Sequence, residues 1–376
     1  MRWAAVWLLC ACGRLEFNEQ PRPDTQLAAT ITAATQLECS THVLLDGGGH
    51  NPHDILRWMF DGEADWLVGA DHYAQDDHKI EGHPIAAVEG VVTAGDAVQI
   101  AQANHVDVLN IVPVPGGHML GYWDFNLGTA YTVAIAPGLA AGTPQALGPL
   151  YGGNSPLARV GSAMLTFAGT AGGAILLAEV GDDAVPTGRQ LQVISPADGP
   201  GPPSVTTVDD GLIVAWRSGA TGGCKLAKVG TDLSIVAGPV DFAVPGCNDP
   251  HVAWLESFRR VIAVAEGSGG LIVAATWNAD LAPLDAPHTI GTGASWPRIA
   301  GDRDAAWVTW AEGTPKQIRN VLLDATALVQ ATSPLFGALD ESLGHYHQID
   351  RSGSETVITW MDSTQGRTFS ARRLCR

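Results

Sequence analysis

The sequence has few charged residues and very few basic ones. Only 16% of its 376 residues are charged, and 21 Lys and Arg stand against 39 Asp and Glu, which gives a formal net charge of −18. The Lys and Arg residues are spread thinly and form no run. Because binding to nucleic acid requires a basic surface, this balance excludes nucleic acid as a partner. It also argues against a polybasic patch that would bind a membrane surface.

The sequence also lacks the common signatures of enzyme active sites. It has no G-x-S-x-G elbow, no H-E-x-x-H pair, and no P-loop or Rossmann glycine pattern. Its glycine clusters (GGG, AGG, SGG) stand between short apolar runs, where they indicate turns. Carboxylate pairs can be assembled from Asp71, Asp76 and Asp107, but sequence does not give the separation that acid–base chemistry requires. No reaction is therefore identified by motif.

The N-terminus carries an apolar run that is too short to cross a bilayer. Residues 3–12 (WAAVWLLCAC) follow a positive Met-Arg start, whereas a spanning helix needs about 20 apolar residues. Length and flanks predict a secretory signal. Residues 9–13 (LCACG) resemble the lipobox of bacterial lipoproteins. An ordinary signal peptide cut nearby is the alternative.

The lipobox resemblance implies an address for the protein. It implies that residues 1–12 are removed up to the lipidated Cys12, and that the mature chain is exported and anchored in the bacterial cell envelope. Gly13 stands where many lipoproteins of the inner membrane have aspartate, which favours the outer membrane. Residues 13–36 are polar and contain proline, so we expect a flexible tether before a domain of residues 37–376.

A repeat of 47 residues organises that domain. Pro156, Pro203, Pro250 and Pro297 follow one another at this interval, and each opens a similar segment (PLARV, PSVTTV, PHVAWL, PRIAGD). A second apolar run follows in each unit and often ends in an aromatic residue, then a glycine-rich turn and a third run. Short β-branched and apolar runs between turns predict strands. Four strands in a unit of about 47 residues are typical of a β-propeller blade.

The repeat predicts an all-β protein with seven four-stranded blades, with six or eight as alternatives. The pattern extends to DILRWMF at 54, DVLNIV at 107 and HQIDRS at 347 with looser spacing. The chain thus resembles the β-propeller lipoproteins of bacterial surfaces over residues 37–376. It lacks the WD40 pair and the sialidase-type Asp-box, so no enzyme family is matched. Trp216, Trp310 and Trp360 recur at matching positions, which favours packing between blades over ligand binding.

The two ends of the domain predict how the ring closes. The last unit has three strands, and one strand is left over at residues 36–48. Antiparallel pairing of that strand with the last one would protect exposed sheet edges and would bring Cys39 beside Cys375. We predict a disulfide there, worth roughly 4–5 kcal/mol on the chain-entropy model. A second disulfide is predicted between Cys224 and Cys247, which fall in one blade.

Histidine and aspartate concentrate on one predicted face of the propeller. Loops that lead into the first strand of a blade share a face with loops that join its second and third strands. Residues 70–84 (ADHYAQDDHKIEGHP) are expected to form an unusually long loop of the latter kind. The candidate ligand-binding residues on this face are His50, His53, Asp54, Asp71, His72, His78, Asp107, His251, Trp296, Arg298, His345 and His347.

Metal binding is an alternative for part of this set. His53, His72, His78 and His347 are candidate ligands, since imidazole and carboxylate together suit Zn²⁺ and a carboxylate-rich set suits Ca²⁺. The other interpretation is that these residues serve as turn and capping residues in a solvated loop. His251 directly follows Pro250 and is expected to be a rim residue, away from the first-blade histidines.

These patterns lead to two functional hypotheses. The first is a lipid-anchored propeller of the cell envelope that binds or scaffolds a protein, peptide or glycan partner, without cofactor or catalysis. The second is an extracytoplasmic glycan hydrolase or lyase that uses the His/Asp face, with or without a divalent metal. Metal analysis and alanine substitution of the candidate histidines would separate them.

Overall fold

The structure is a computed structural model of the chain. It describes residues 43–45, 51–60, 64–74, 77–88, 91–160, 164–194, 196–339, 347–352, 355–362 and 368–374. The predicted signal segment, the tether, Cys12, Cys39 and Cys375 lie outside the described residues. In the described part of the chain, no helix is long and apolar enough to span a membrane.

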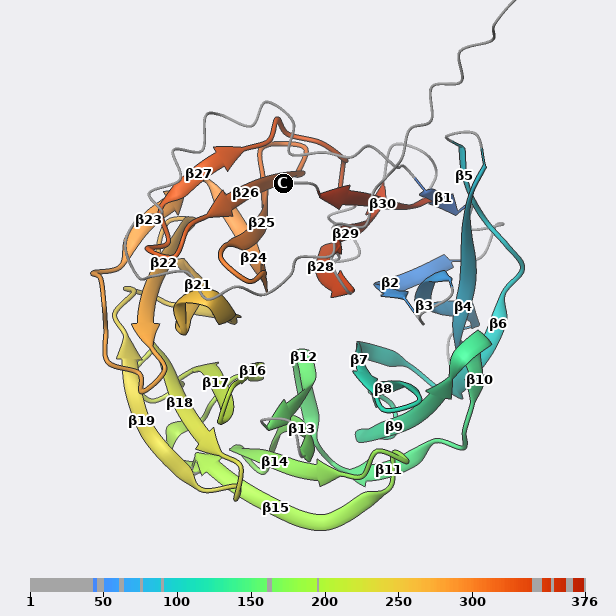
Figure 1. The fold of residues 1–376 in the computed structure, drawn as a ribbon, viewed down its shortest axis with the longest axis horizontal. Coiled ribbons are helices and arrows are strands. Elements are labelled where there is room, and N and C mark those ends of the chain that lie inside the picture. Colours follow the sequence, from blue (N-terminus) through green and yellow to red (C-terminus); the bar gives the residue numbers. More distant parts are fainter. Residues whose placement is uncertain are drawn as a thin grey trace, which may run out of the picture. The chain divides into compact units, whose positions relative to one another are not determined.

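The described residues form seven antiparallel sheets, as the repeat predicts (Figure 1). Each sheet is named here after its first strand. Five of these sheets have four strands, and the β2 and β7 sheets have a fifth strand that pairs with their third. In the last sheet the fourth strand comes from the N-terminal side. The β2 sheet consists of β2 (Asn51–Phe60), β3 (Asp65–Ala74), β4 (Asp77–Val88), β5 (Val91–Ala94) and β6 (Val98–Ala103). The β7 sheet consists of β7 (Val106–Val114), β8 (Gly117–Asp124), β9 (Thr129–Ala136), β10 (Ala140–Ala141) and β11 (Gln145–Gly148). The β12 sheet consists of β12 (Tyr151–Val160), β13 (Met164–Ala171), β14 (Ala174–Val180) and β15 (Pro186–Ile194).

The remaining four sheets follow in chain order. The β16 sheet consists of β16 (Ser204–Val208), β17 (Gly211–Arg217), β18 (Cys224–Gly230) and β19 (Ile235–Phe242), and the β20 sheet of β20 (Asn248–Leu255), β21 (Arg260–Gly267), β22 (Leu271–Asn278) and β23 (His288–Gly291). The β24 sheet consists of β24 (Ala294–Gly301), β25 (Ala306–Glu312), β26 (Gln317–Leu323) and β27 (Val329–Thr332). The β28 sheet consists of β28 (His347–Ser352), β29 (Glu355–Asp362), β30 (Thr368–Leu374) and β1 (Val43–Leu45). Three short 3-10 turns occur at Pro137–Leu139, Pro196–Asp198 and Glu256–Phe258.

The hydrophobic core lies between successive sheets. Six clusters of buried residues each draw on two sheets that follow one another in the chain. Trp216, Trp310 and Trp360 are buried in three of these clusters, which confirms their predicted packing role. The strands have small or β-branched residues on both faces because both faces meet a neighbouring sheet.

The first strands lie innermost in Figure 1 and contact one another. Contacts join β2 to β7, β7 to β12, β12 to β16, β16 to β20, β20 to β24 and β24 to β28, and β28 also contacts β2. The predicted pairing of the N-terminal strand is present over three residues, since Val43, Leu44 and Leu45 of β1 lie opposite Ala371, Ser370 and Phe369 of β30. The predicted Cys39–Cys375 disulfide at this closure stays a prediction.

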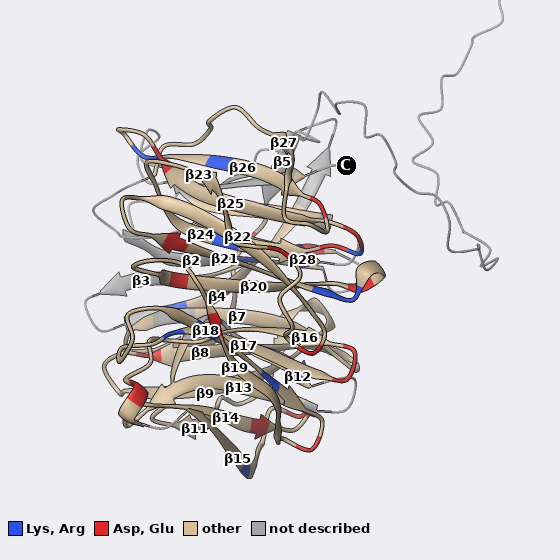
Figure 2. Cartoon of the chain, turned by 90° about the vertical axis from the view of Figure 1, so that its left-hand side faces the viewer, with Lys and Arg blue, Asp and Glu red and all other residues tan. Residues whose placement is uncertain are grey.

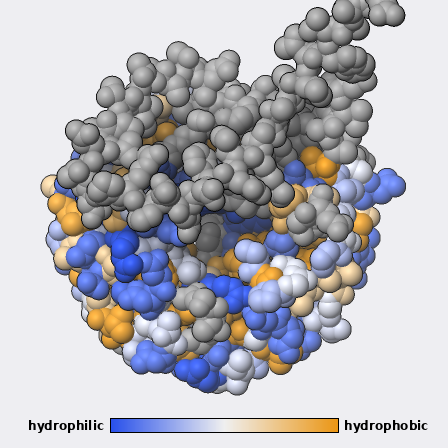
Figure 3. Space-filling model, viewed as in Figure 1, coloured by the Kyte–Doolittle hydropathy of each residue, from blue (hydrophilic) through white to orange (hydrophobic). Residues whose placement is uncertain are grey.

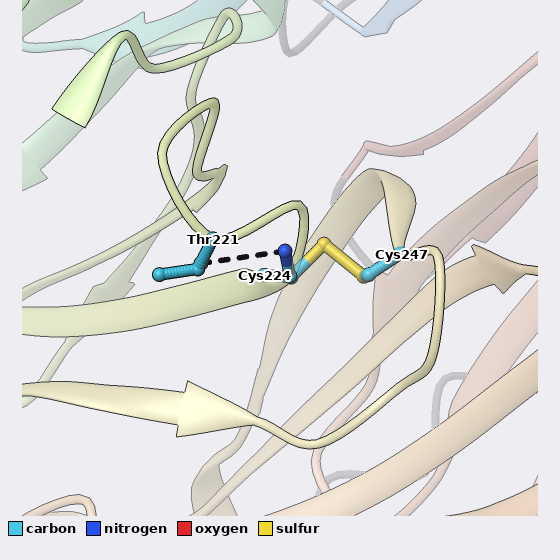
Figure 4. Close-up of a disulfide and its surroundings, with 4 residues drawn as sticks. Thr221, Cys224 and Cys247 are labelled. Carbon is cyan, nitrogen blue, oxygen red and sulfur yellow. Dashed lines mark hydrogen bonds between the residues drawn. A yellow bond between two sulfur atoms is a disulfide. The ribbon is translucent and has the colours of Figure 1, made fainter.

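The second predicted disulfide is present. Cys224, the first residue of β18, is bonded to Cys247, which directly precedes β20 (Figure 4). Both cysteines are buried in the cluster between the β16 and β20 sheets. The bond therefore ties two neighbouring sheets together at one edge of their shared core.

Each sheet has two ends, which define two faces of the molecule. We call one of these ends the front face. At this end the first strand of each sheet begins, and a turn joins the second strand to the third. The rear face carries the turns between first and second strands and between third and fourth strands. Antiparallel meander order places every sheet in the same sense, so each residue of a turn can be assigned to a face.

Candidate functional site

One position of the repeat recurs on the first strands near the front face. Asn110, Leu157, Ser204, His251 and Arg298 stand 47 residues apart, and all five are buried. Two neighbouring pairs are bonded across this interval: the backbone N–H of Leu157 donates to Oδ1 of Asn110 over 3.1 Å, and Arg298 contacts His251. The repeat therefore places one buried residue on the first strand of each of five sheets, and these residues differ in their chemistry.

β-Bulges shape two of these strands just before the shared position. The register of β20 shifts between Asn248 and His251, and that of β24 shifts between Ser295 and Arg298. Inside the bulges Asp249 has φ +47° and Trp296 has φ +59°. Aspartate tolerates this left-handed region, whereas for a bulky tryptophan it costs backbone strain. Each bulge turns the residue before a proline away from the regular alternation of the strand.

Arg298 is the hub of the contacts at this point. Its Nη1 donates to Oδ2 of Asp249 over 2.6 Å and to the Pro297 carbonyl over 2.7 Å, and it lies 3.0 Å from Nε2 of His251. Nε2 of His251 also lies 3.2 Å from Oδ1 of Asp249. Arg298 and His251 are buried, whereas 26% of the Asp249 side chain remains exposed. Of these three side chains, only that of Asp249 is partly exposed.

The charges of this group act strongly on one another. Burial opposes ionisation of Asp249, but Arg298 and His251 outweigh it and hold the pKa of Asp249 well below its ordinary value. Burial lowers the pKa of His251, and the positive charge of Arg298 lowers it further while Asp249 raises it. Near neutral pH the Asp249–Arg298 ion pair is formed and the His251 imidazole is neutral.

A second buried arginine lies on β2. Nε of Arg57 donates to the Leu109 carbonyl over 2.7 Å, and its Nη1 donates to Oε1 of Gln348 over 3.1 Å and to Oδ1 of Asp350 over 3.0 Å. Only 2% of the Arg57 side chain is exposed. Burial lowers the pKa of Arg57, the Asp350 charge raises it, and Arg298 lowers it. Arg57 thus joins the β2, β7 and β28 sheets.

His347 begins β28 and completes the group. It is fully buried, and neither ring nitrogen makes a hydrogen bond of normal geometry. Burial lowers the pKa of His347 to about 3; Arg298 lowers it further, and the nearby backbone of Thr309 raises it. The imidazole is therefore neutral at physiological pH. We call these six residues the central charged cluster: Arg57, Asp249, His251, Arg298, His347 and Asp350.

The structure brings together only part of the set predicted from sequence. His251, Arg298 and His347 belong to the central charged cluster, so His251 is a buried member of a polar group that also includes His347. His50 and His345 lie outside the described residues. For the other candidates the description covers the backbone and not the side chains: His53, Asp54, Asp71, His72, His78 and Asp107.

The expected long loop over residues 70–84 is wrong. These residues form the ends of β3 and β4, where His72 lies opposite His78 in the antiparallel pair and Asn51 lies opposite His72. A loop was predicted because the segment is rich in His, Asp and Lys, but the antiparallel pairing of backbones does not require apolar side chains. Among the residues that the structure describes, no group of three or more His, Cys, Asp or Glu is placed to hold a metal ion. The metal site involving His53, His72, His78 and His347 stays a prediction.

An aromatic group on the front face was missed by the sequence analysis. Trp123 packs against Phe125 in an edge-to-face arrangement and against Tyr151, with ring centroids 5.3 and 4.4 Å apart, and Phe125 also contacts His105. Phe125 is 56% exposed in the turn between β8 and β9. The available signal was the run Tyr122-Trp123-Asp124-Phe125 at a turn between second and third strands. Trp296, a predicted site residue, is half-buried on the same face, with Nζ of Lys316 5.8 Å from its ring centroid.

The rear face has a different composition. Acidic residues occur in the turns at one end of the sheets (Figure 2). Several of them accept hydrogen bonds within their own turns, as Asp183 does from Val185, Asp232 from Ser234 and Asp324 from Thr326. These aspartates are explained by turn formation. Other acidic residues of the rear-face turns form ion pairs, as Asp209 does with Arg259 and Asp210 with Lys228.

Comparison with solved structures identifies the fold class. The structure of BBS1N in complex with ARL6DN is similar over 92% of this chain and 98% of that chain, with a TM-score of 0.55 and 11% identity. The AfRom2 CNH domain matches 89% of this chain and 99% of its own, with a TM-score of 0.53 and 10% identity. A protein from Lactobacillus plantarum matches 76% and 86%, with a TM-score of 0.52 and 12% identity.

The chain is thus a β-propeller. Identities this low show the fold alone. No protein-family model matches the sequence, and no curated protein matches it either.

Proposed function

We propose that the protein is a lipid-anchored β-propeller of the bacterial cell envelope that binds a protein, peptide or glycan partner at its front face. The observation that carries the binding role is the central charged cluster, whose six side chains come from the β2, β20, β24 and β28 sheets. Buried ions are costly unless they are paired, and apolar residues would join these strands at lower cost. A cluster of charged side chains beneath one face is suited to bind a polar or charged partner.

The exposed aromatic group on the front face supports the same role. In the view of Figure 1, hydrophilic and hydrophobic residues are mixed over the coloured part of the surface (Figure 3). Phe125 and its neighbours add an exposed aromatic group on the front face, and aromatic residues are frequent anchors of binding sites. BBS1N, a structure of similar fold, is in complex with the protein ARL6DN. A protein partner for this chain is proposed by analogy with that complex.

Export through the lipobox-like segment is the second part of the proposal. The Cys224–Cys247 disulfide supports it, because disulfides persist in oxidising compartments outside the cytoplasm. Acylated Cys12 would then hold the propeller at the outer membrane. Labelling with radioactive palmitate tests this part: the wild-type chain should become labelled and the Cys12→Ser variant should not. Equal labelling of both chains would refute the anchor and leave the binding role open.

Two exposed phenylalanines on opposite faces provide a test of the binding role. Phe125 lies in a front-face turn and is 56% exposed, whereas Phe258 lies in a rear-face turn and is 50% exposed. A photo-crosslinking phenylalanine analogue at position 125 should give a discrete partner adduct in cells, and the same analogue at position 258 should not. Equal adducts at both positions, or adducts at 258 alone, would refute a front-face site.

A further inference from the structure

The guanidinium group of Arg298 has one edge whose donors make no hydrogen bond within the described residues. All its hydrogen bonds come from Nη1, which contacts Asp249, His251 and the Pro297 carbonyl. Nε is buried and has no hydrogen-bond partner. No hydrogen bond involves Nη2 among the described residues either. The Nε–Nη2 edge of arginine is a planar fork of two parallel N–H donors that matches the two oxygens of a carboxylate.

Two further buried side chains lie in register with Arg298. In the β24 sheet Arg298 lies opposite Thr309, and Thr309 lies opposite Asn320. Residues directly opposite each other share one face of an antiparallel sheet. Thr309 and Asn320 are fully buried, and Oγ1 of Thr309 and both Nδ2 and Oδ1 of Asn320 have no hydrogen-bond partner. These three residues form a row of polar groups without partners.

His347 faces this row from the neighbouring sheet. It interacts electrostatically with Arg298, the backbone of Thr309 lies near its ring, and both of its ring nitrogens lack a hydrogen bond of normal geometry. Arg298, Thr309, Asn320 and His347 together hold six of the nine buried side-chain N and O atoms that make no hydrogen bond in the described part of the chain. The other three atoms are scattered: Nε1 of Trp123, Nε1 of Trp254 and Oε2 of Glu179, which forms an ion pair with Arg189.

The donors of this group define the chemistry of a ligand. Arg298, the Asn320 amide, the Thr309 hydroxyl and the neutral imidazole all offer N–H or O–H groups, which an oxyanion accepts. A divalent cation does not fit, because a guanidinium repels it and amide N–H groups do not ligate metals. One negative charge can be balanced in place, because His347 can take up a proton when an anion lies beside it.

We propose that Arg298, Thr309, Asn320 and His347 form a receptor for one carboxylate group of a ligand, at the junction of the β24 and β28 sheets. The carboxylate accepts from the Nε–Nη2 edge of Arg298 and from the Thr309 hydroxyl or the His347 ring. Its source is the C-terminus or an acidic side chain of a peptide, or an acidic sugar. This inference rests on the proposed binding role and names the chemistry that the partner carries.

Isothermal titration of the purified full-length protein tests the site with small probes. The probes are acetyl-trialanine with a free C-terminus, the same peptide as its amide, glucuronate and glucose. The free-acid peptide or glucuronate should bind, and the amide and glucose should not. Binding of the peptide alone or of glucuronate alone identifies the source. Affinity should be higher at pH 5.5 than at pH 7.5, because His347 takes up a proton on binding.

Isosteric substitutions test the residues. Thr309→Val should weaken carboxylate binding by about tenfold or more, because it removes a hydrogen bond to a charged group. Thr132→Val is the matched control, since Thr132 is equally buried but donates to the Ala184 carbonyl in another seam. It should leave carboxylate binding unchanged. His347→Gln should abolish the pH dependence of affinity.

The proposal is overturned if neither carboxylate probe binds when it is added in 10-fold molar excess, at concentrations up to the millimolar range. It is also overturned if Thr309→Val and His347→Gln leave binding unchanged. A crystal structure grown with glucuronate that holds only water beside Arg298 would overturn it as well. If the crosslinked partner still binds while both variants have no effect on it, the carboxylate site is wrong and the binding role stands. If the probes still bind but no front-face adduct forms, the carboxylate site stands and the front-face binding role is wrong.

Discussion

The titration of one buried residue, His347, couples the stability of the protein to pH. Its folded-state pKa is about 3, against an ordinary value of 6.5 in the unfolded chain. Between these values the unfolded state binds more protons than the folded state, so stability rises with pH. The contribution is fully present above pH 6.5 and is lost as the pH falls toward 3.

We expect acidification to destabilise the protein in that range. Lowering the pH from 7 to 5 should reduce the free energy of unfolding by about 2 kcal/mol through His347 alone. Urea unfolding at a series of pH values measures this. In His347→Gln the loss over the same range should shrink by about that amount, and the slope that remains is assigned to groups such as His251, whose pKa is also lowered by burial. An unchanged slope in the variant would contradict the assignment.

The Asp249–Arg298 ion pair makes a second prediction at the residue scale. Arg298→Met leaves the Asp249 carboxylate without its 2.6 Å partner, and we expect a loss of about 3 kcal/mol in the free energy of unfolding. The double variant Asp249→Asn/Arg298→Met removes both charges and should lose less than the single Arg298→Met. Urea unfolding of the wild-type chain, Arg298→Met, Asp249→Asn and the double variant gives the coupling energy. Additive losses would show that the two side chains do not stabilise each other.

At the scale of elements, the backbones of β17 and β18 approach each other closely at Gly211. A Cβ added to Gly211, at the start of β17, would lie 2.2 Å from the Val229 carbonyl oxygen of β18. We expect Gly211→Ala to lower the free energy of unfolding by about 1–3 kcal/mol, because the two strands must separate. Gly223→Ala is the control, since its nearest neighbour would be 3.6 Å away. That change should stay within about 0.5 kcal/mol. Similar losses in both variants would contradict the close approach.

The Cys224–Cys247 disulfide links two sheets that are also joined by their core. It closes a loop of sequence separation 23. The double variant Cys224→Ser/Cys247→Ser should lose about 3 kcal/mol on the chain-entropy model. Urea unfolding of the variant and of the reduced wild-type chain should give the same lower midpoint. A wild-type midpoint that does not respond to reductant would show that the bond adds no stability.

Elements were easier to predict from sequence than the contacts that form the site. Pro250 and Pro297 mark a repeat, and repeats report local strand pattern, so the first strands of these sheets were predicted correctly. Arg57 was missed because it stands in an apolar strand and its partner Asp350 is 293 residues away. Sequence spacing gives the phase of a residue on its own strand. It does not give which strand from another sheet brings the opposite charge.

At the scale of the whole molecule, the last sheet joins distant parts of the chain. Its strands β28, β29 and β30 come from the C-terminal end, and β1 covers the edge of β30. Its first strand is held on one side by Arg57 of β2 and interacts on the other with Arg298 of β24. The β28 sheet therefore depends on polar contacts at its inner strand and on β1 at its outer strand.

Truncation of the N-terminal side tests the outer contact. Deletion of residues 1–46 removes β1 and leaves the backbone of β30 as an unpaired sheet edge. We expect a loss of about 1–3 kcal/mol in the free energy of unfolding, from the lost strand hydrogen bonds, and concentration-dependent association through the exposed edge. Deletion of residues 1–36 retains β1 and should behave as the full-length chain does. Urea unfolding and light scattering compare the two. If both truncated chains are equally stable and monomeric, β1 does not protect the last sheet, and the stability of that sheet must come from its inner contacts with Arg57 and Arg298.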